Sequence, residues 1–135
     1  AIARKEIAKA GVGDRVKTRA GDYFRDEFGR RFDAVYVSNI IHSLSPDDTR
    51  MLFEKSRRAM NPGGTVIVKD FFLDDSRTAP LSAALFSINM LTATEGGKSY
   101  TWTETQELLA AAGFGRFERM PVAMASGLLI ARAKS

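Results

Sequence analysis

Two nearly continuous apolar runs, separated by a well-marked helix, constrain the fold of this chain more than any other feature. The runs are FDAVYVSN (32–39) and TVIVKDFF (65–72), and unbroken apolar runs of this length are typical of strands covered on both faces. Between them, SPDDTRMLFEKSRRAM (45–60) has Ser45 as its predicted N-cap and Pro46 at its first helical position. Strands that alternate with helices in this way predict an α/β sheet.

The remaining segments extend the same alternation. The sequence predicts a helix already under way at residue 1 that ends at Gly11–Gly13, and a short strand at Arg15–Arg19. It also predicts a helix over 79–94 and another over 101–112 that starts at Thr101 or Thr103 and stops at Gly113. Two final strands, Phe114–Arg119 and Gly127–Arg132, are close enough in sequence to pair antiparallel. The pattern predicts a mostly parallel sheet with an antiparallel edge, in one domain over residues 1–135.

The predicted helix over 79–94 carries a regular apolar stripe. Its members recur at helical spacing: Leu81, Leu85, Ile88 and Leu91. Such a stripe is typical of the face that a helix turns toward a core.

Composition excludes several classes of protein. The 135 residues contain no cysteine, so disulfides and thiolate metal sites are excluded. With one histidine and no HExxH-like spacing, no metal site is predicted. The net charge of +4 is mild, and aromatic residues are not interleaved with the basic ones, so no nucleic-acid partner is expected. No apolar run is long enough for a bilayer and no signal-peptide pattern opens the chain, so a cytoplasmic protein without a membrane partner is expected.

Polar residues gather where the predicted strands end. Asp22 follows the first strand, Ser38, Asn39 and His42 follow the second, and Asp70 ends the third. Because ligands bind outside the carboxyl ends of strands in open α/β sheets, a common cleft is predicted there. Each residue also has an ordinary alternative. An aspartate after glycine is often a turn residue, an asparagine is often a cap, and His42 could be a loop residue bonded to backbone.

Two longer segments carry a family resemblance. AGDYFRDEFGRRFDAVYVSNIIHSLSPDDTRMLFEKSRRAMNPGGTVIVKDFF (20–72) and EGGKSYTWTETQELLAAAGF (95–114) resemble the C-terminal half of the catalytic domain of S-adenosylmethionine-dependent O-methyltransferases. The similar members are of the plant phenolic, hydroxyindole and bacterial polyketide type. The resemblance implies a Rossmann-like class I methyltransferase sheet, S-adenosylmethionine as cofactor, and a small-molecule acceptor.

The resemblance also implies roles for individual residues. In this family the aspartate of the GD turn binds the adenine amino group and its neighbour packs against the ring, which are Asp22 and Tyr23 here. The strand end that lines the methionine and sulfonium side corresponds to Ser38 and Asn39. The family's general base corresponds to His42. A neutral imidazole suits this role because it can take the proton of a phenol at neutral pH.

Further positions follow from the same resemblance. The family commonly orients the base with two glutamates, and the corresponding positions hold Asp70 and, in the GGK loop, Ser99. The helix before that loop helps to wall the acceptor pocket, which points to Phe86, Met90 and Thr94. For Phe86 and Met90, ordinary core packing is an equal alternative.

The chain departs from the family pattern in two ways. The family's HDW is His42-Ser43-Leu44 here, which leaves the acceptor class open. The glycine-rich loop and the acidic residue that binds the ribose are not among these 135 residues, so the sheet is expected to be incomplete on its N-terminal side. We therefore expect a portion of a longer protein, a homo-oligomer such as a dimer, or association with the missing N-terminal part. Two functions remain open: O-methyl transfer, or a non-catalytic fragment or complementing subunit.

Overall fold

A mixed four-stranded sheet organises the computed structural model, which describes residues 2–122 and 126–134. The strands lie in the order β1-β2-β4-β3. Their bounds are β1 (Phe32–Ser38), β2 (Met60–Asp70), β3 (Phe114–Pro121) and β4 (Gly127–Ala133). The helices are α1 (Ile2–Lys9), α2 (Pro46–Ala59), α3 (Leu81–Ala93) and α4 (Trp102–Ala111), with one 3₁₀ turn, η1 (Ile41–Ser43).

The pairing of the strands confirms the predicted α/β class. Strands β1 and β2 are parallel and are joined through α2, and Ser38 lies level with Lys69. Strand β4 pairs antiparallel with both β2 and β3, which forms the predicted antiparallel edge. The described strands thus make one parallel pairing and two antiparallel ones, so the parallel share is smaller than the sequence predicted.

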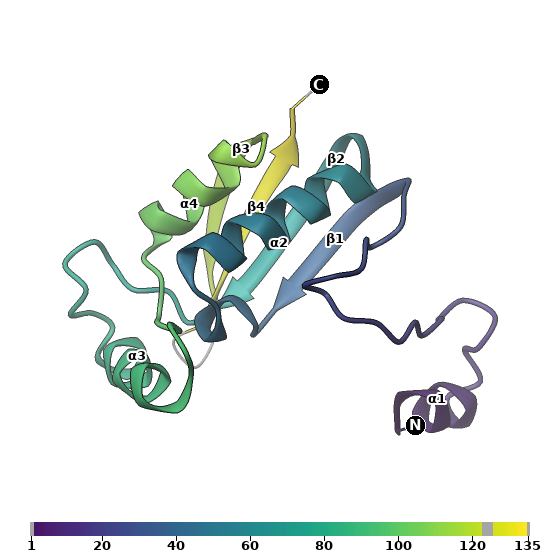
Figure 1. Cartoon of the computed structure of the whole chain (residues 1–135), viewed down its shortest axis with the longest axis horizontal. Helices are drawn as coiled ribbons and strands as arrows, with labels where there is room; N and C mark the ends of the chain where they lie inside the picture. Colours follow the sequence, from purple (N-terminus) through teal and green to yellow (C-terminus); the bar gives the residue numbers. More distant parts are fainter. Residues whose placement is uncertain (1, 123–125, 135) are drawn as a thin grey trace.

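The segment 15–19 accounts for this difference, because the strand predicted at Arg15–Arg19 is not formed. A strand needs a neighbour to satisfy its backbone hydrogen bonds, and none of the described strands lies beside this segment. Helix α1, which precedes it, forms as predicted but buries no residue and stands apart from the sheet (Figure 1). Ala1, where the predicted helix began, lies outside the described residues.

Helices cover one face of the sheet in the described structure. Figure 1 shows α2 and α4 side by side against the same face. Beneath them lie fully buried side chains from both layers: Phe53, Val66, Val68, Leu109, Phe114 and Leu129. The other face carries Tyr36, Ile67 and Ile130 in register, and Tyr36 is 60% exposed. Within the described residues, helices therefore cover only one face of these apolar strands.

The two helices on the sheet begin as their sequences predicted. Ser45 caps α2, since its hydroxyl accepts a hydrogen bond from the Asp48 amide at 3.2 Å. Thr101, rather than Thr103, caps α4, where Thr101 and Glu104 form a reciprocal capping box. Both caps satisfy amides that the helix cannot satisfy internally, so the helix starts are fixed locally.

Helix α3 turns its apolar stripe outward. The four stripe residues, Leu81, Leu85, Ile88 and Leu91, are between 58% and 70% exposed. The predicted stripe is thus an exposed face, and the inward side of α3 carries Ala83 and Phe86. Despite this apolar surface, neither α3 nor any other helix within the described ranges has the length and hydrophobicity to cross a bilayer.

Candidate active site

His42 and Asp70 form a close pair at the carboxyl edge of the sheet. The His42 Nδ1 lies 2.7 Å from an Asp70 carboxylate oxygen, and the side chains are 15% and 3% exposed. The other carboxylate oxygen accepts the His42 backbone amide at 3.4 Å, and Asp70 also accepts the Phe71 amide at 2.8 Å. Because an ionised carboxylate only accepts hydrogen bonds, Nδ1 carries the proton in the neutral ring. The lone pair is then on Nε2, where it can accept a proton.

The parallel strands explain why these two side chains meet. His42 lies four residues beyond the end of β1, and Asp70 is the last residue of the neighbouring β2. Between β1 and η1 the chain reverses at Asn39, whose φ of 53° is left-handed, a conformation that asparagine tolerates better than most residues. The Asn39 amide donates to the Lys69 carbonyl at 2.9 Å, which holds the reversal against β2.

Aromatic side chains from two elements surround the histidine ring. Phe86 of α3 meets His42 edge to face, with ring centroids 4.9 Å apart. Phe71, directly after β2, packs on Phe86 at 4.6 Å and lies 6.4 Å from the imidazole. Phe86, predicted as a wall of the acceptor pocket, therefore lies against the predicted base. An apolar wall beside a proton acceptor suits an aromatic ligand.

Met90 and Thr94, the other two predicted pocket residues, lie farther along α3. The Met90 carbonyl accepts both the amide and the hydroxyl of Thr94, at 3.0 and 2.8 Å. The Thr94 hydroxyl also accepts the Gly97 amide at 3.1 Å. These contacts end α3 and fasten the following loop. They give Thr94 a local structural role, and its place in an acceptor pocket stays a prediction.

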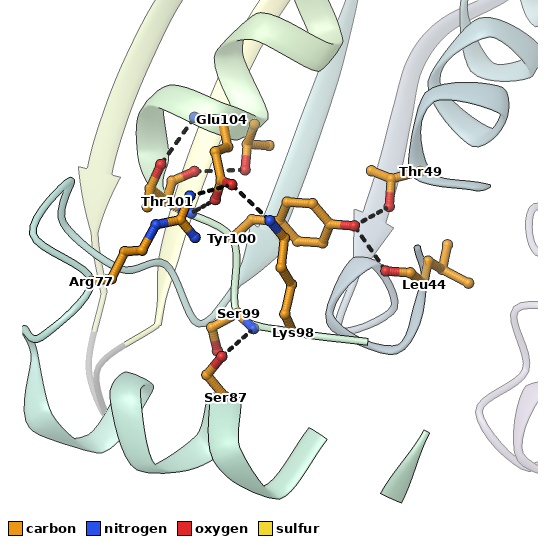
Figure 2. A network of polar contacts seen from close by, with 10 residues as sticks. Leu44, Thr49, Arg77, Ser87, Lys98, Ser99, Tyr100, Thr101 and Glu104 are labelled. Atoms are coloured by element: carbon orange, nitrogen blue, oxygen red, sulfur yellow. Dashed lines mark hydrogen bonds and ion pairs between the residues drawn. The ribbon is translucent and has the colours of Figure 1, made fainter. Parts of the chain in front are cut away.

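The GGK loop packs directly on the turn that carries His42. A Cβ atom added at Gly97 would lie 2.5 Å from the His42 carbonyl oxygen and 3.0 Å from the Ser43 Cα, so only glycine fits without a shift. Ser99, by contrast, faces α3: its hydroxyl donates to the Ala83 carbonyl at 3.1 Å, and its amide donates to Ser87 at 3.0 Å (Figure 2). Ser99 therefore anchors the loop to α3 and is not bonded to His42.

The hollows along β1 contain Asp22 and Tyr23, predicted for the adenine end, and Ser38, predicted for the methionine and sulfonium side. Tyr23 and Ser38 line the same hollow of about 450 Å³, which runs along the free edge of β1. Asp22 lines a neighbouring hollow of about 250 Å³ together with Tyr23. The Asp22 carboxylate accepts the Phe24 amide at 2.9 Å, as turn residues often do. His42 and Asp70 are thus in direct contact at one edge, where Asn39 bonds to Lys69. Tyr23 shares one hollow with Ser38 and the other with Asp22.

A buried lysine holds the segment that carries Asp22 and Tyr23. Lys55 of α2 is 5% exposed, and its ammonium donates to the carbonyls of Tyr23, Phe24 and Asp26 at 2.9, 2.7 and 3.2 Å. Three carbonyls satisfy the three protons of the ammonium, which makes its burial tolerable. The sequence analysis missed Lys55. The available signal was a lysine between Leu52 and Ser56 on the buried side of α2.

Lys69 is a second site residue that the sequence analysis missed. Its ammonium lies 3.2 Å from the Asn39 side-chain oxygen and 5.9 Å from the centre of the Phe71 ring. It therefore places a positive charge on the same edge as the His42–Asp70 pair. A cation inside the apolar run TVIVKD, directly before Asp70, was the signal for it.

The loop before α4 contains a charged cluster around Glu104 (Figure 2). One Glu104 oxygen accepts hydrogen bonds from the Lys98 ammonium and the Arg77 guanidinium, each at 2.7 Å. The other oxygen accepts a hydrogen bond from the Thr101 amide at 2.8 Å. Burial alone raises the pKa of Glu104, but these hydrogen bonds outweigh it and lower the pKa to about 2. Glu104 is therefore ionised at neutral pH. Within the described ranges, no three histidine, aspartate or glutamate side chains group as metal ligands would.

Sequence comparison relates most of the chain to one group of proteins. The family model described as the O-methyltransferase domain matches residues 1–115. A 3-hydroxy-5-methyl-1-naphthoate 3-O-methyltransferase of Streptomyces sahachiroi is 37% identical over 84% of this chain and 32% of its own length. An L-tyrosine C(3)-methyltransferase of Streptomyces lavendulae is 33% identical over 84% of this chain and 31% of its own. The acetylserotonin O-methyltransferase of Gallus gallus is 37% identical over 74% of this chain and 28% of its own length.

Solved structures show the same fold. An O-methyltransferase family 2 protein from Planctomyces limnophilus, in complex with apigenin, superposes with a TM-score of 0.89 at 27% identity, over 97% of this chain and 38% of its own. Human N-acetylserotonin methyltransferase, in complex with SAM, gives a TM-score of 0.80 at 27% identity. The match covers 92% of this chain and 37% of the human protein's chain. The chain thus spans about a third of the length of the curated relatives it matches.

Proposed function

Since this chain belongs to the O-methyltransferase domain family, we propose that it takes part in transferring a methyl group from S-adenosylmethionine to a hydroxyl of a small aromatic acceptor. The His42–Asp70 pair is the single observation that carries this proposal. The relatives named above for a naphthoate and for acetylserotonin support an aromatic acceptor.

His42 is the proposed general base. Asp70 fixes the ring so that the proton lies on Nδ1 and Nε2 is free to take the acceptor's hydroxyl proton. As the acceptor oxygen loses that proton it becomes nucleophilic, and the buried Asp70 carboxylate stabilises the imidazolium that forms. Phe86 and Phe71 provide an apolar wall that can hold an aromatic ring beside His42.

The residues present fit the adenine end of the proposed cofactor. The hollow along β1 has the ring of Tyr23 and the side chain of Ser38 in its lining, with Asp22 beside it. Asp22 and Tyr23 would hold the adenine, in a segment kept in place by Lys55. Ser38 would line the methionine and sulfonium side. When bound, S-adenosylmethionine supplies an electrophilic methyl group on its sulfonium.

These residues are further proposed to act within a longer polypeptide, or with a partner chain, that supplies the remainder of the cofactor site. Two features support this: the chain spans about a third of its curated relatives, and one face of the sheet carries exposed apolar residues such as Tyr36. The alternative proposal is a methyltransferase-fold segment that binds the cofactor without turnover.

Replacing His42 tests the proposed base. In the longer polypeptide, His42→Gln keeps the size of the side chain but removes proton acceptance, so methyl transfer should fall roughly 10²- to 10⁴-fold. Binding of S-adenosylmethionine, measured by calorimetry, should change little, because the proposed adenine contacts lie along β1. Arg50→Gln, at an exposed pair with Asp47, is the matched control and should leave turnover unchanged.

Two outcomes would contradict the proposal. Near-normal turnover in His42→Gln would remove His42 from the mechanism. Cofactor binding without transfer to any phenolic acceptor in the unmodified protein would favour the non-catalytic alternative. Product analysis would also detect methyl transfer to a ring carbon, which the name of the Streptomyces lavendulae relative describes for tyrosine. In that case the accepting atom would be carbon and not the hydroxyl oxygen.

A further inference from the structure

Tyr100 connects the two segments that carry His42 and Asp70. It lies in the loop between α3 and α4 and is 2% exposed. Its hydroxyl donates to the Leu44 carbonyl at 2.8 Å, two residues after His42 (Figure 2). Its backbone carbonyl accepts the Leu73 amide at 3.0 Å, three residues after Asp70. One residue therefore bonds to the chain just beyond each member of the pair.

We propose that Tyr100 is a positioning residue, which holds the His42 turn and the end of β2 at the separation that the His42–Asp70 hydrogen bond requires. This inference rests on the proposed function, because it concerns the alignment of the proposed base. Tyr100 acts on His42 and Asp70 through its bonds to Leu44 and Leu73.

Both ends of this connection are firmly held. At the hydroxyl end, Thr49 in the first turn of α2 donates to the Tyr100 oxygen at 3.2 Å. At the backbone end, the Trp102 amide donates to the Leu73 carbonyl at 3.1 Å, so Leu73 is bonded on both sides. Since Leu44 and Leu73 are each 3% exposed, little water can replace the bonds that Tyr100 makes there.

The electrostatic surroundings keep the Tyr100 hydroxyl protonated. Burial is the largest of the causes that together raise the pKa of Tyr100 to about 12, despite the hydrogen bond from Thr49, which lowers it. The negative charges of Glu104, Asp48 and Asp70 are smaller causes of the same rise. The hydroxyl can therefore donate to the Leu44 carbonyl throughout the neutral range. The Lys98 ammonium, 4.8 Å from the ring centre, packs on the same side chain.

The packing of the loop gives the connection a direct route to the base. Gly97 lies against the His42 carbonyl and Ser43, so the loop that carries Tyr100 already touches the turn. Loss of the hydroxyl would leave the Leu44 carbonyl without this donor and would free the turn to move. Small displacements of a base from its productive geometry reduce rate strongly while leaving binding elsewhere intact.

Tyr100→Phe in the longer polypeptide tests the inference, because it removes the hydroxyl and keeps the ring. We expect kcat to fall about tenfold, with the KM for S-adenosylmethionine unchanged. The His42 Nδ1 proton signal, identified in NMR spectra by its absence in His42→Gln, should broaden or move. Thr105→Val is the matched control, since it also removes a buried hydroxyl, one that donates to the Thr101 carbonyl at 2.9 Å. It should lower stability but leave kcat and the His42 signal unchanged.

The results separate this inference from the proposed function. Methyl transfer that depends on His42 but is unaffected by Tyr100→Phe would overturn the positioning role alone. An equal fall of kcat in Thr105→Val would also overturn it, because general destabilisation would then explain the effect. If Tyr100→Phe does not fold, Thr49→Val, which loosens the hydroxyl, should lower kcat about threefold. Unchanged kcat in that variant would overturn the inference.

Discussion

At the scale of single residues, Glu104 shows how a cluster of donors changes the behaviour of one side chain. Its pKa of about 2 lies below the ordinary value of 4.5, so the folded state binds this proton less readily than the unfolded state does. The stabilisation it provides is therefore fully present above pH 4.5 and is lost as the pH falls toward 2. Because Lys98 and Arg77 are partly exposed, solvent screens their attraction to Glu104. The stabilisation from the Glu104 charge is therefore on the order of 2 kcal/mol.

Glu104→Gln should accordingly reduce the free energy of unfolding at pH 7, as measured by urea denaturation. The difference between the two proteins should shrink steadily from pH 4.5 toward pH 2, because protonation removes the same charge from the unmodified protein. Glu107→Gln, on an exposed position of α4, provides the control. A difference that stays constant between pH 7 and pH 3 would show that the charge of Glu104 contributes nothing.

Residues that depend on local sequence were predictable, and residues that depend on tertiary contacts were not. His42 and Asp70 could be placed at one edge because strand ends converge in a parallel pair, and the structure brings them into contact. Tyr100 has no local signature, and the only one for Lys55 is its place on the buried side of α2, since the partners of both are backbone carbonyls far away in the sequence. A lysine in an amphipathic helix looks like a surface residue until the segment that covers it is known.

At the scale of elements, helix α2 connects the two strands of the site and begins four residues after His42. Ser45 caps it by accepting the Asp48 amide and by donating to the Asp48 carboxylate at 2.6 Å. Ser45→Ala should lower the free energy of unfolding by about 1 kcal/mol, because the amide loses its partner. Ser76→Ala, at an exposed loop position, should lower the free energy of unfolding by less. Chemical denaturation of both variants checks this, and equal effects would contradict it.

The elements also show where prediction from sequence stops. The caps of α2 and α4 are fixed by residues within one turn, so their starts were predictable. The strand predicted at Arg15–Arg19 needs a neighbour that these residues do not provide, so its alternating pattern was insufficient. The stripe on α3 was recognisable, but periodicity alone cannot say whether an apolar face meets this chain's core or something outside it.

At the scale of the whole molecule, exposed apolar surface should govern how the 135 residues behave when expressed alone. The stripe on α3 is mostly exposed, and so is Tyr36 on the uncovered face of the sheet. We expect self-association at micromolar concentrations, measured by sedimentation velocity, because contiguous apolar patches favour contact with another surface. Replacing Leu85 and Leu91 together by Gln should shift the distribution toward monomer, whereas Asn89→Gln should not. A monomeric unmodified chain would contradict this expectation.

The His42–Asp70 pair and the aromatic side chain of Phe86 come from different elements of the fold. This separation affects how such a protein can diversify. His42 and Asp70 come from adjoining strand ends, whereas Phe86 comes from α3, an element held by the loops around it. Substitutions on the inner side of α3 can thus reshape the space beside the imidazole without disturbing the sheet. Relatives named for a naphthoate, for tyrosine and for acetylserotonin match between 74% and 84% of this chain. Changes in one helix can therefore alter the space beside His42 while the His42–Asp70 pair stays as it is.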